Sequence, residues 1–306
     1  MTPGVDWPAG HRFAFTVFDD PDAQSLGVSR EVYALLGDLG FRTTKAVWLL
    51  EPPERNSPGE TCASPDFLAF NRALQRNGFE IAYHNGAPGT LERQDVIRSL
   101  DLFREYFGTD PASMANHYNG DAIYWGDARL SGPVRAMYNL VSRGPKPHFG
   151  HVEGHPCFWG DICLRRIRYC RNFVFRRTNT LSACPYMPYT DPDRPYVQAW
   201  YAASEGANCH SFLRRCAESE QDRLEEDGGA CIMYTHFGHG FVQDGALHPE
   251  FTRLMTRLAA KNGWFVPVTT LLDRLRHRRG LHTLTAAQRS RMEATWLMTK
   301  LVHGTS

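Results

Sequence analysis

Residues 13–22 read Phe-Ala-Phe-Thr-Val-Phe-Asp-Asp-Pro-Asp, and they constrain the fold more than any other stretch. The apolar run has no clean alternation with polar residues, which is typical of a strand buried on both faces of a parallel sheet. Pro21 cannot donate to the sheet and ends the strand, so Asp19 and Asp20 lie at its carboxyl end. In parallel α/β folds this is the edge where ligands bind. One of the two repelling carboxylates is therefore expected to bind a cation or to have a raised pKa, the alternative being a solvated turn.

Strand and helix patterns alternate along the first 120 residues. The predicted strands cover residues 13–19, 44–50, 79–83 and 113–116, and the predicted helices cover residues 29–39, 66–76 and 91–107. Such an alternation is typical of a parallel sheet whose strands are joined by crossover helices. Further strands are predicted over residues 173–175, 230–235 and 264–268, and further helices over residues 128–140, 209–227, 249–261, 270–277 and 285–302.

Charge and composition exclude several classes of protein. The chain has 34 basic and 33 acidic residues among 306, so no nucleic-acid-binding surface is predicted. No apolar run reaches the length of about 18 residues that a membrane span needs. The first eleven residues lack the pattern of a secretory signal, and none of the eight cysteines forms a Cys-x-x-Cys pair. These features predict a cytoplasmic protein whose cysteines are reduced and mostly structural.

Polar side chains follow four of the predicted strands. Asp19 and Asp20 follow the first, and His84, His117 and His236 follow three others. A carboxylate with two imidazoles is a common ligand set for zinc, iron, cobalt or nickel. Any one histidine can instead be a packed or surface residue, and the chain has thirteen of them. Their equivalent positions at strand ends nevertheless predict a divalent metal site, most simply a zinc site.

The motifs around these residues resemble those of the polysaccharide deacetylases, also called NodB-homology or carbohydrate esterase family 4 hydrolases. The family's Thr-Phe-Asp-Asp-Gly motif is similar to residues 16–21, Thr-Val-Phe-Asp-Asp-Pro, and its late strand ending in histidine is similar to residues 231–236. Residues 263–272 are similar to its usual ending. The resemblance implies that Asp19 is the catalytic base, Asp20 and His84 are metal ligands, and His236 is the general acid.

Two departures from the family pattern affect the expected site. The second motif, His-Ser/Thr-x-x-His, begins at His84 but has Pro88 in place of its second histidine. We expect His117 to be the third ligand, with His151 and His155 as alternatives. The family's Arg-x-Pro-Tyr motif, whose arginine holds the base, is also absent after the fourth strand. These changes indicate a divergent member that acts on a small sugar conjugate or another amide.

Substrate contacts are expected from side chains that follow the strand ends or lie in turn-rich segments. The predicted substrate-binding residues are Tyr118, Asn119, Trp125, His155, Trp159 and His239. The aromatic members can stack on sugar faces, although such residues at a barrel rim are as often part of the core. Arginines at 165, 166, 168 and 171 form a local basic cluster, which we expect to be a solvated face; the alternative is a site for a phosphate or carboxylate.

The resemblance implies an α/β fold, a distorted (β/α)7 barrel of the NodB-homology type. We expect this barrel to cover residues 1–280 and a C-terminal helical extension to cover residues 281–306, packed on the barrel or at a homodimer interface. The expected function is metal-dependent hydrolysis of an N- or O-acyl group, such as acetyl, on a sugar-containing substrate. The alternatives are a non-catalytic carbohydrate-binding relative and another hydrolytic reaction on the same metal platform.

Overall fold

The computed structural model describes residues 5–142, 144 and 147–303. The first residues of the barrel predicted over 1–280 and the last residues of the extension predicted over 281–306 therefore lie outside the described residues. The strands are β1 (Phe13–Asp19), β2 (Thr44–Val47), β3 (Glu80–Tyr83), β4 (Ser113–Met114), β5 (Tyr169–Phe175), β6 (Tyr189–Thr190), β7 (Ala199–Glu205), β8 (Ala230–Thr235), β9 (Val242–Gln243), β10 (Ala246–Leu247), β11 (Gly263–Trp264) and β12 (His282–Thr283). The α-helices are α1 (Leu26–Asp38), α2 (Pro65–Arg76), α3 (Arg93–Phe107), α4 (Gly132–Val141), α5 (Gly160–Arg166), α6 (Thr180–Ala183), α7 (Cys209–Arg215), α8 (Glu218–Glu226), α9 (Pro249–Ala259), α10 (Val268–Arg279) and α11 (Ala286–His303). Two 3-10 helices are η1 (Pro8–Gly10) and η2 (Gly126–Arg129).

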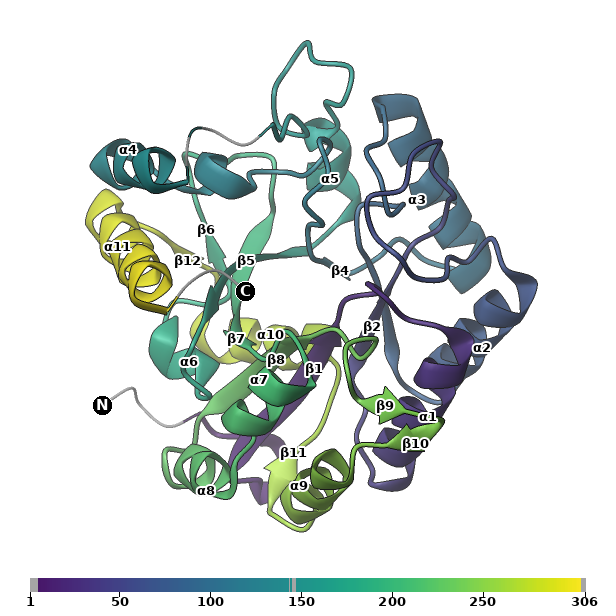
Figure 1. Cartoon of the computed structure of the whole chain (residues 1–306). Helices are drawn as coiled ribbons and strands as arrows, with labels where there is room; N and C mark the ends of the chain where they lie inside the picture. The colour runs from purple at the N-terminus through teal and green to yellow at the C-terminus, as the bar shows by residue number, and fades with distance from the viewer. Residues whose placement is uncertain (1–4, 143, 145–146, 304–306) are drawn as a thin grey trace.

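Seven parallel strands close into a barrel surrounded by helices (Figure 1). The ring runs β1-β2-β3-β4-β5-β7-β8 and returns to β1 through the β1–β8 pair. Because all these pairs are parallel, the carboxyl ends of the strands meet at one rim of the barrel. The predicted (β/α)7 barrel is confirmed.

The first strand, β1, is buried along its whole length, which explains why its sequence lacks polar alternation. The helix that follows begins at Ser25, whose hydroxyl accepts a hydrogen bond from the Val28 amide at 3.3 Å. The predicted helix starts at Ser29, four residues after this cap. The loop between β1 and α1, which carries the acidic residues, is therefore shorter than predicted.

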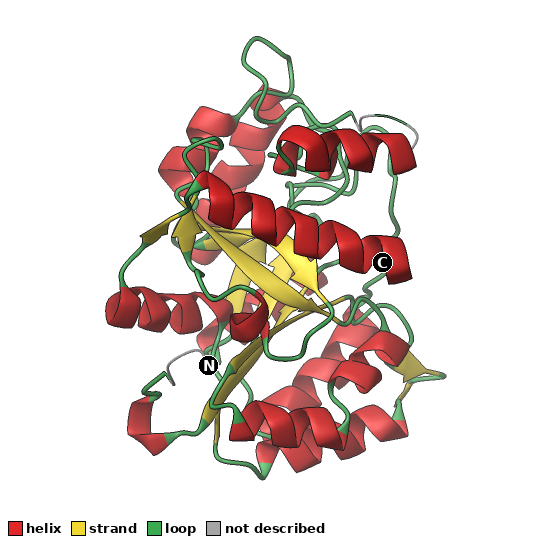
Figure 2. Ribbon diagram, turned by 90° about the vertical axis from the view of Figure 1, so that its left-hand side faces the viewer, coloured by secondary structure: helices red, strands yellow, loops and turns green. Residues whose placement is uncertain are grey.

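The last helix, α11, lies beside α4 and covers part of the barrel (Figures 1 and 2). Its Trp296 ring is 5.4 Å from the Phe173 ring of β5 and 5.9 Å from the Tyr138 ring of α4, measured between centroids. Just before it, β12 pairs with β6, which extends the sheet from β7. The predicted C-terminal helix thus packs on the barrel.

The structure differs from the predicted elements in three main places. The predicted helix over 209–227 is two helices, α7 and α8, because Ala217 has an extended backbone (φ −55°, ψ 152°). The predicted strand over 264–268 is short, since Val268 already begins α10. Strand β7, buried along its whole length, was not predicted. All eight cysteines are buried and unpaired, and no described helix is both long and apolar enough to cross a membrane.

Candidate metal-binding and catalytic site

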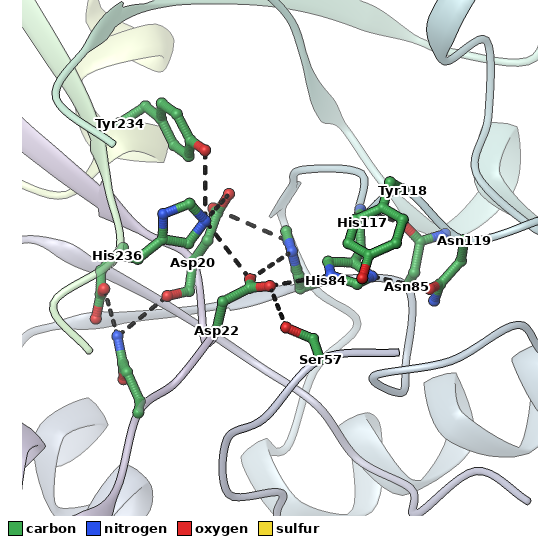
Figure 3. Close-up of polar contacts among 12 residues, drawn as sticks. Asp20, Asp22, Ser57, His84, Asn85, His117, Tyr118, Asn119, Tyr234 and His236 are labelled. Carbon is green, nitrogen blue, oxygen red and sulfur yellow. Dashed lines mark hydrogen bonds and ion pairs between the residues drawn. The ribbon is translucent and has the colours of Figure 1, made fainter. Parts of the chain in front are cut away.

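Three buried side chains, Asp22, His84 and His117, meet at the carboxyl rim of the barrel. One ligand atom from each lies within 4.8 Å of the others. Asp22 Oδ1 is 3.0 Å from His117 Nε2, and Asp22 Oδ2 is 3.6 Å from His84 Nε2 (Figure 3). Among the described residues, Asp22 Oδ2 and His84 Nδ1 are buried without a hydrogen-bond partner. Unpartnered buried donor atoms of this kind, in a set of one carboxylate and two imidazoles, fit a divalent metal.

The cluster is held by a second layer of hydrogen bonds. Ser57 donates to Asp22 Oδ1 at 2.7 Å, and Asn119 Oδ1 lies 2.8 Å from His117 Nδ1. Asn119 Oδ1 also accepts from Asn56, so it acts as an acceptor and the His117 Nδ1 nitrogen carries the hydrogen. In the neutral ring this leaves His117 Nε2 without a hydrogen, whereas in the protonated ring Nε2 would donate to Asp22 Oδ1. Such orientation by a second hydrogen bond is usual for metal-binding histidines.

The pKa values of the cluster reflect both its burial and its charges. Burial lowers the pKa of His84. Burial would also lower the pKa of His117, but its hydrogen bond and ion pair with Asp22 raise it overall. For Asp22 burial acts in the opposite direction, yet the hydrogen bond with His117 and the neighbouring His84 imidazole hold the pKa of the carboxyl far below its ordinary value. At neutral pH the cluster therefore offers an ionised carboxylate.

The carboxylate that lies beside the two histidines is Asp22, whereas the sequence analysis expected Asp20 as the acidic metal ligand. Both oxygens of Asp20 are bound by the Arg171 guanidinium, with N–O distances of 3.0 and 2.5 Å. Arg171 comes from β5 and is fixed between the Phe18 and Tyr234 rings, at 5.2 and 4.3 Å from their centroids. The sequence showed no arginine near the expected base. The buried Arg171 pairs with Asp20 and not with Asp19, the expected base. Its assignment to a solvated face was wrong, since it is 2% exposed.

Asp19 lies apart from the cavity side of the rim. Its carboxylate accepts hydrogen bonds from Gln24, from the Tyr33 hydroxyl at 2.8 Å and from the Phe237 amide at 3.0 Å. The Lys45 ammonium is 3.6 Å away, and both side chains are fully buried. Successive strand residues point to opposite faces, so Asp19 is directed toward the helices while Asp20 faces the site. Asp19 does not line the cavity that the other acidic residues share, so the role of base expected for Asp19 stays a prediction without a geometric observation in its support.

We expect Lys45→Met to destabilise the protein by about 3–5 kcal/mol, because Asp19 would remain buried without its cation. The double variant Asp19→Asn/Lys45→Met removes both charges and should unfold at a higher urea concentration than Lys45→Met alone. Free energies of unfolding from urea titrations measure both. A double variant as unstable as the single one would show that charge pairing is not what the two side chains contribute.

His236 lies directly after β8, on the other side of the acidic pair. Its Nδ1 is 2.7 Å from the Ala207 carbonyl oxygen, which can only accept, so Nδ1 carries a hydrogen. Its Nε2 is 3.6 Å from Asp22, 4.0 Å from Asp20 and 3.3 Å from the Tyr234 hydroxyl (Figure 3). The nitrogen that can exchange a proton therefore faces the site.

The loop after His236 is pressed against the loop after β1. A Cβ atom on Gly238 would lie 2.4 Å from the Ala23 carbonyl carbon, so only glycine fits this close approach. Ala23 itself has a positive φ of 56°, which turns the chain so that Asp22 faces the histidines. Contact between the two loops fixes the distance between the acidic residues and His236.

A cavity of about 990 Å³ joins these groups. Asp20, Asp22, His84, His117 and His236 lie along it together with side chains from α4 and α11. The α11 members are Trp296, Leu297, Lys300 and Leu301. A cavity of this size admits a molecule as large as a typical cofactor or small conjugate.

The residues predicted to bind substrate divide into two groups. Tyr118, Trp125 and His239 line the cavity. Asn119 is buried and orients His117, Trp159 is buried and donates to the Asp121 carbonyl oxygen at 2.6 Å, and His155 stacks on Phe149 at 4.0 Å. These last three do not line the cavity, so their predicted substrate contacts have no support in the geometry.

The alternative third ligands, His151 and His155, do not belong to the Asp22–His84–His117 cluster. His151 accepts a hydrogen bond from the Tyr124 amide at 3.2 Å. The other three arginines of the predicted basic cluster each form an ion pair with aspartate: Arg165 with Asp161, Arg166 with Asp101 and Asp110, and Arg168 with Asp273. They offer no open site for a phosphate or carboxylate.

The sequence matches no family model, and no curated protein is significantly similar to it. A solved structure from Mycobacterium smegmatis, named as a polysaccharide deacetylase, covers 92% of this chain and 96% of its own, with 14% identity and a TM-score of 0.55. The barrel has the deacetylase fold. This likeness at 14% identity identifies a fold, and the reaction depends on the site itself.

Two further structures are similar at lower scores. A family 4 acetyl xylan esterase from Clostridium thermocellum, solved with cobalt, covers 88% of this chain and 92% of its own, with 12% identity and a TM-score of 0.41. A deacetylase-named protein from Bordetella bronchiseptica covers 89% and 93%, with 14% identity and a TM-score of 0.38. The fold assignment rests on the Mycobacterium smegmatis structure, whose TM-score exceeds 0.5.

Proposed function

We propose that this deacetylase-like barrel is a metal-dependent hydrolase that removes an N- or O-acyl group, such as acetyl, from a sugar-containing substrate. The observation that carries the proposal is the buried Asp22–His84–His117 cluster, which shares one cavity with the Asp20–Arg171 pair and His236. A divalent metal bound by the three residues would polarise the acyl carbonyl and make a water molecule more acidic. Zinc fits this donor set, as do iron, cobalt and nickel.

The other residues divide the proton transfers between them. Asp20, fixed in orientation by Arg171, takes the proton from the attacking water as general base. His236, when protonated on both nitrogens, gives a proton from Nε2 to the departing amine or alcohol, while its Nδ1–H group keeps donating to the Ala207 carbonyl oxygen. The two groups lie on one side of the cluster, with 4.0 Å between Asp20 Oδ2 and His236 Nε2. The proposal thus retains His236 as the general acid and assigns the role of base to Asp20 in place of Asp19.

Elemental analysis of the purified protein tests the proposal directly. We expect about one divalent ion per chain, because the cluster supplies a single set of three ligands. Acetate release from acetylated amino sugars and sugar esters should stop after treatment with a chelator and return when zinc or cobalt is added. A protein without metal that still binds sugars would be the non-catalytic relative. Hydrolysis that persists in the metal-free protein would contradict the metal role.

A further inference from the structure

Arg129, the last residue of η2, is 7% exposed and lines the same cavity as the Asp22–His84–His117 cluster. Its guanidinium carbon lies 3.9 Å from the centroid of the Trp125 ring and 4.8 Å from that of the Trp296 ring. Trp296 belongs to α11, so segments far apart in the chain hold this side chain. Contact with the two indoles fixes the guanidinium and leaves donors at its edge for a ligand.

No carboxylate of the described residues forms an ion pair with Arg129. Its printed partners are carbonyl oxygens: Nε donates to Gly126 at 3.2 Å, and Nη1 donates to Asn172 at 3.4 Å. A side chain with five N–H donors thus has two long bonds to neutral groups, although a buried charge is normally paired.

The neighbouring cations do have carboxylates. Arg171 is paired with Asp20, and Glu205 lies 3.3 Å from Lys300 and 3.6 Å from Arg176. Among the described residues Arg129 therefore lacks the carboxylate partner that these neighbouring cations have. Burial, with a smaller effect from the charge of Arg171, lowers the pKa of Arg129 to about 10, so the group is still a cation at neutral pH.

We propose that Arg129 binds an anionic group, a carboxylate or a phosphate, on the molecule that occupies the cavity. The inference deepens the proposed function and depends on it for the sugar: the substrate would be an acylated sugar that carries a negative charge. An incoming anion would supply the missing partner of a buried guanidinium, whose fork of donors matches carboxylate and phosphate oxygens. A neutral acetylated polymer would leave Arg129 unpaired.

Binding of three probes to the full-length protein tests the inference. The probes are inorganic phosphate, glucuronate and neutral glucose, each titrated by calorimetry. We expect glucuronate or phosphate to bind and glucose to bind at least about tenfold more weakly, as a charged hydrogen bond predicts. Stronger binding of glucuronate identifies a carboxylate on the substrate, and stronger binding of phosphate identifies a phosphate.

Variants separate Arg129 from the other cations. Arg129→Met should weaken binding of the anionic probe by at least about tenfold, and Arg129→Lys should restore part of it because the charge returns without the fork. Arg135→Met is the matched control, since Arg135 is half exposed, pairs with Asp127 at 2.7 Å and does not line the cavity. Circular dichroism checks that each variant is folded.

The same titrations on Asp22→Ala distinguish the two proposals. Anion binding that survives in Asp22→Ala but is lost in Arg129→Met supports the inference even if the protein holds no metal. Binding lost in Asp22→Ala and unchanged in Arg129→Met would place the anion on the metal and overturn it. Equal binding of glucose and glucuronate to the wild-type protein would overturn it without any variant, so a poorly folding variant does not decide the outcome.

Discussion

Replacing Asp22 with alanine is expected to remove the bound metal and to lower the rate of acyl hydrolysis by about 10³-fold or more. Asp22 is the residue that contacts both histidines, through Oδ1 to His117 at 3.0 Å and Oδ2 to His84 at 3.6 Å. Without its charge two imidazoles remain, and two neutral ligands bind a divalent ion weakly. Elemental analysis and initial rates with an acetylated sugar measure the two effects on one preparation.

Asn119→Ala is a graded control for this prediction. It removes the acceptor that fixes the His117 tautomer but leaves all three ligands in place. Loss of such a second-layer partner typically costs about 10- to 100-fold in metal affinity or activity. Metal should therefore bind Asn119→Ala more weakly and Asp22→Ala hardly at all. If Asp22→Ala keeps a full complement of metal, the cluster is not the metal site.

Asp20→Asn is expected to keep the metal and to lower the rate by about 10²- to 10⁴-fold, as removal of a general base does. An amide has the shape of the carboxylate but cannot accept the proton from water. Arg171 would lose its charge partner, so the variant should also be less stable by about 3–5 kcal/mol. Rates and metal content of the variant and the wild-type protein are therefore compared under conditions in which a urea titration shows both to be folded.

The result separates two assignments of the acidic residues. Loss of metal in Asp20→Asn would make Asp20 a ligand, which is the role that the resemblance implied. Retention of metal with a low rate supports the base role proposed from the Arg171 contact. Asp19→Asn is the matched control, because the same change one residue earlier affects the Lys45 contact and should leave the rate per folded molecule unchanged.

The barrel could be predicted because its signals are local. The buried β1 run, the alternation of strands with amphipathic helices and the strand that precedes His236 each follow from the order of neighbouring residues. Strand β7 escaped prediction because its sequence, Ala-Trp-Tyr-Ala-Ala-Ser-Glu, is rich in alanine, which has a low preference for strands. Its strand form depends on pairing with β5 and β8, which are distant in sequence.

The site was predictable only in outline, for the same reason. That His84, His117 and His236 follow strands is visible in the sequence, and the structure brings them to one rim. The distinction between Asp20 and Asp22 depends on which oxygens Arg171 reaches from β5, and no spacing encodes that contact. The one available signal was Pro21: it ends the strand and places Asp22 in a turn, where a side chain can face back toward the rim.

The helix α11 supplies a wall of the cavity although it lies outside the ring of strands that carries the proposed reactive residues. The shape of the cavity is therefore set in part by a helix that carries none of the proposed reactive residues. Substitutions at Leu297 or Leu301 can change which molecules fit the cavity while Asp20, Asp22 and His236 stay in place.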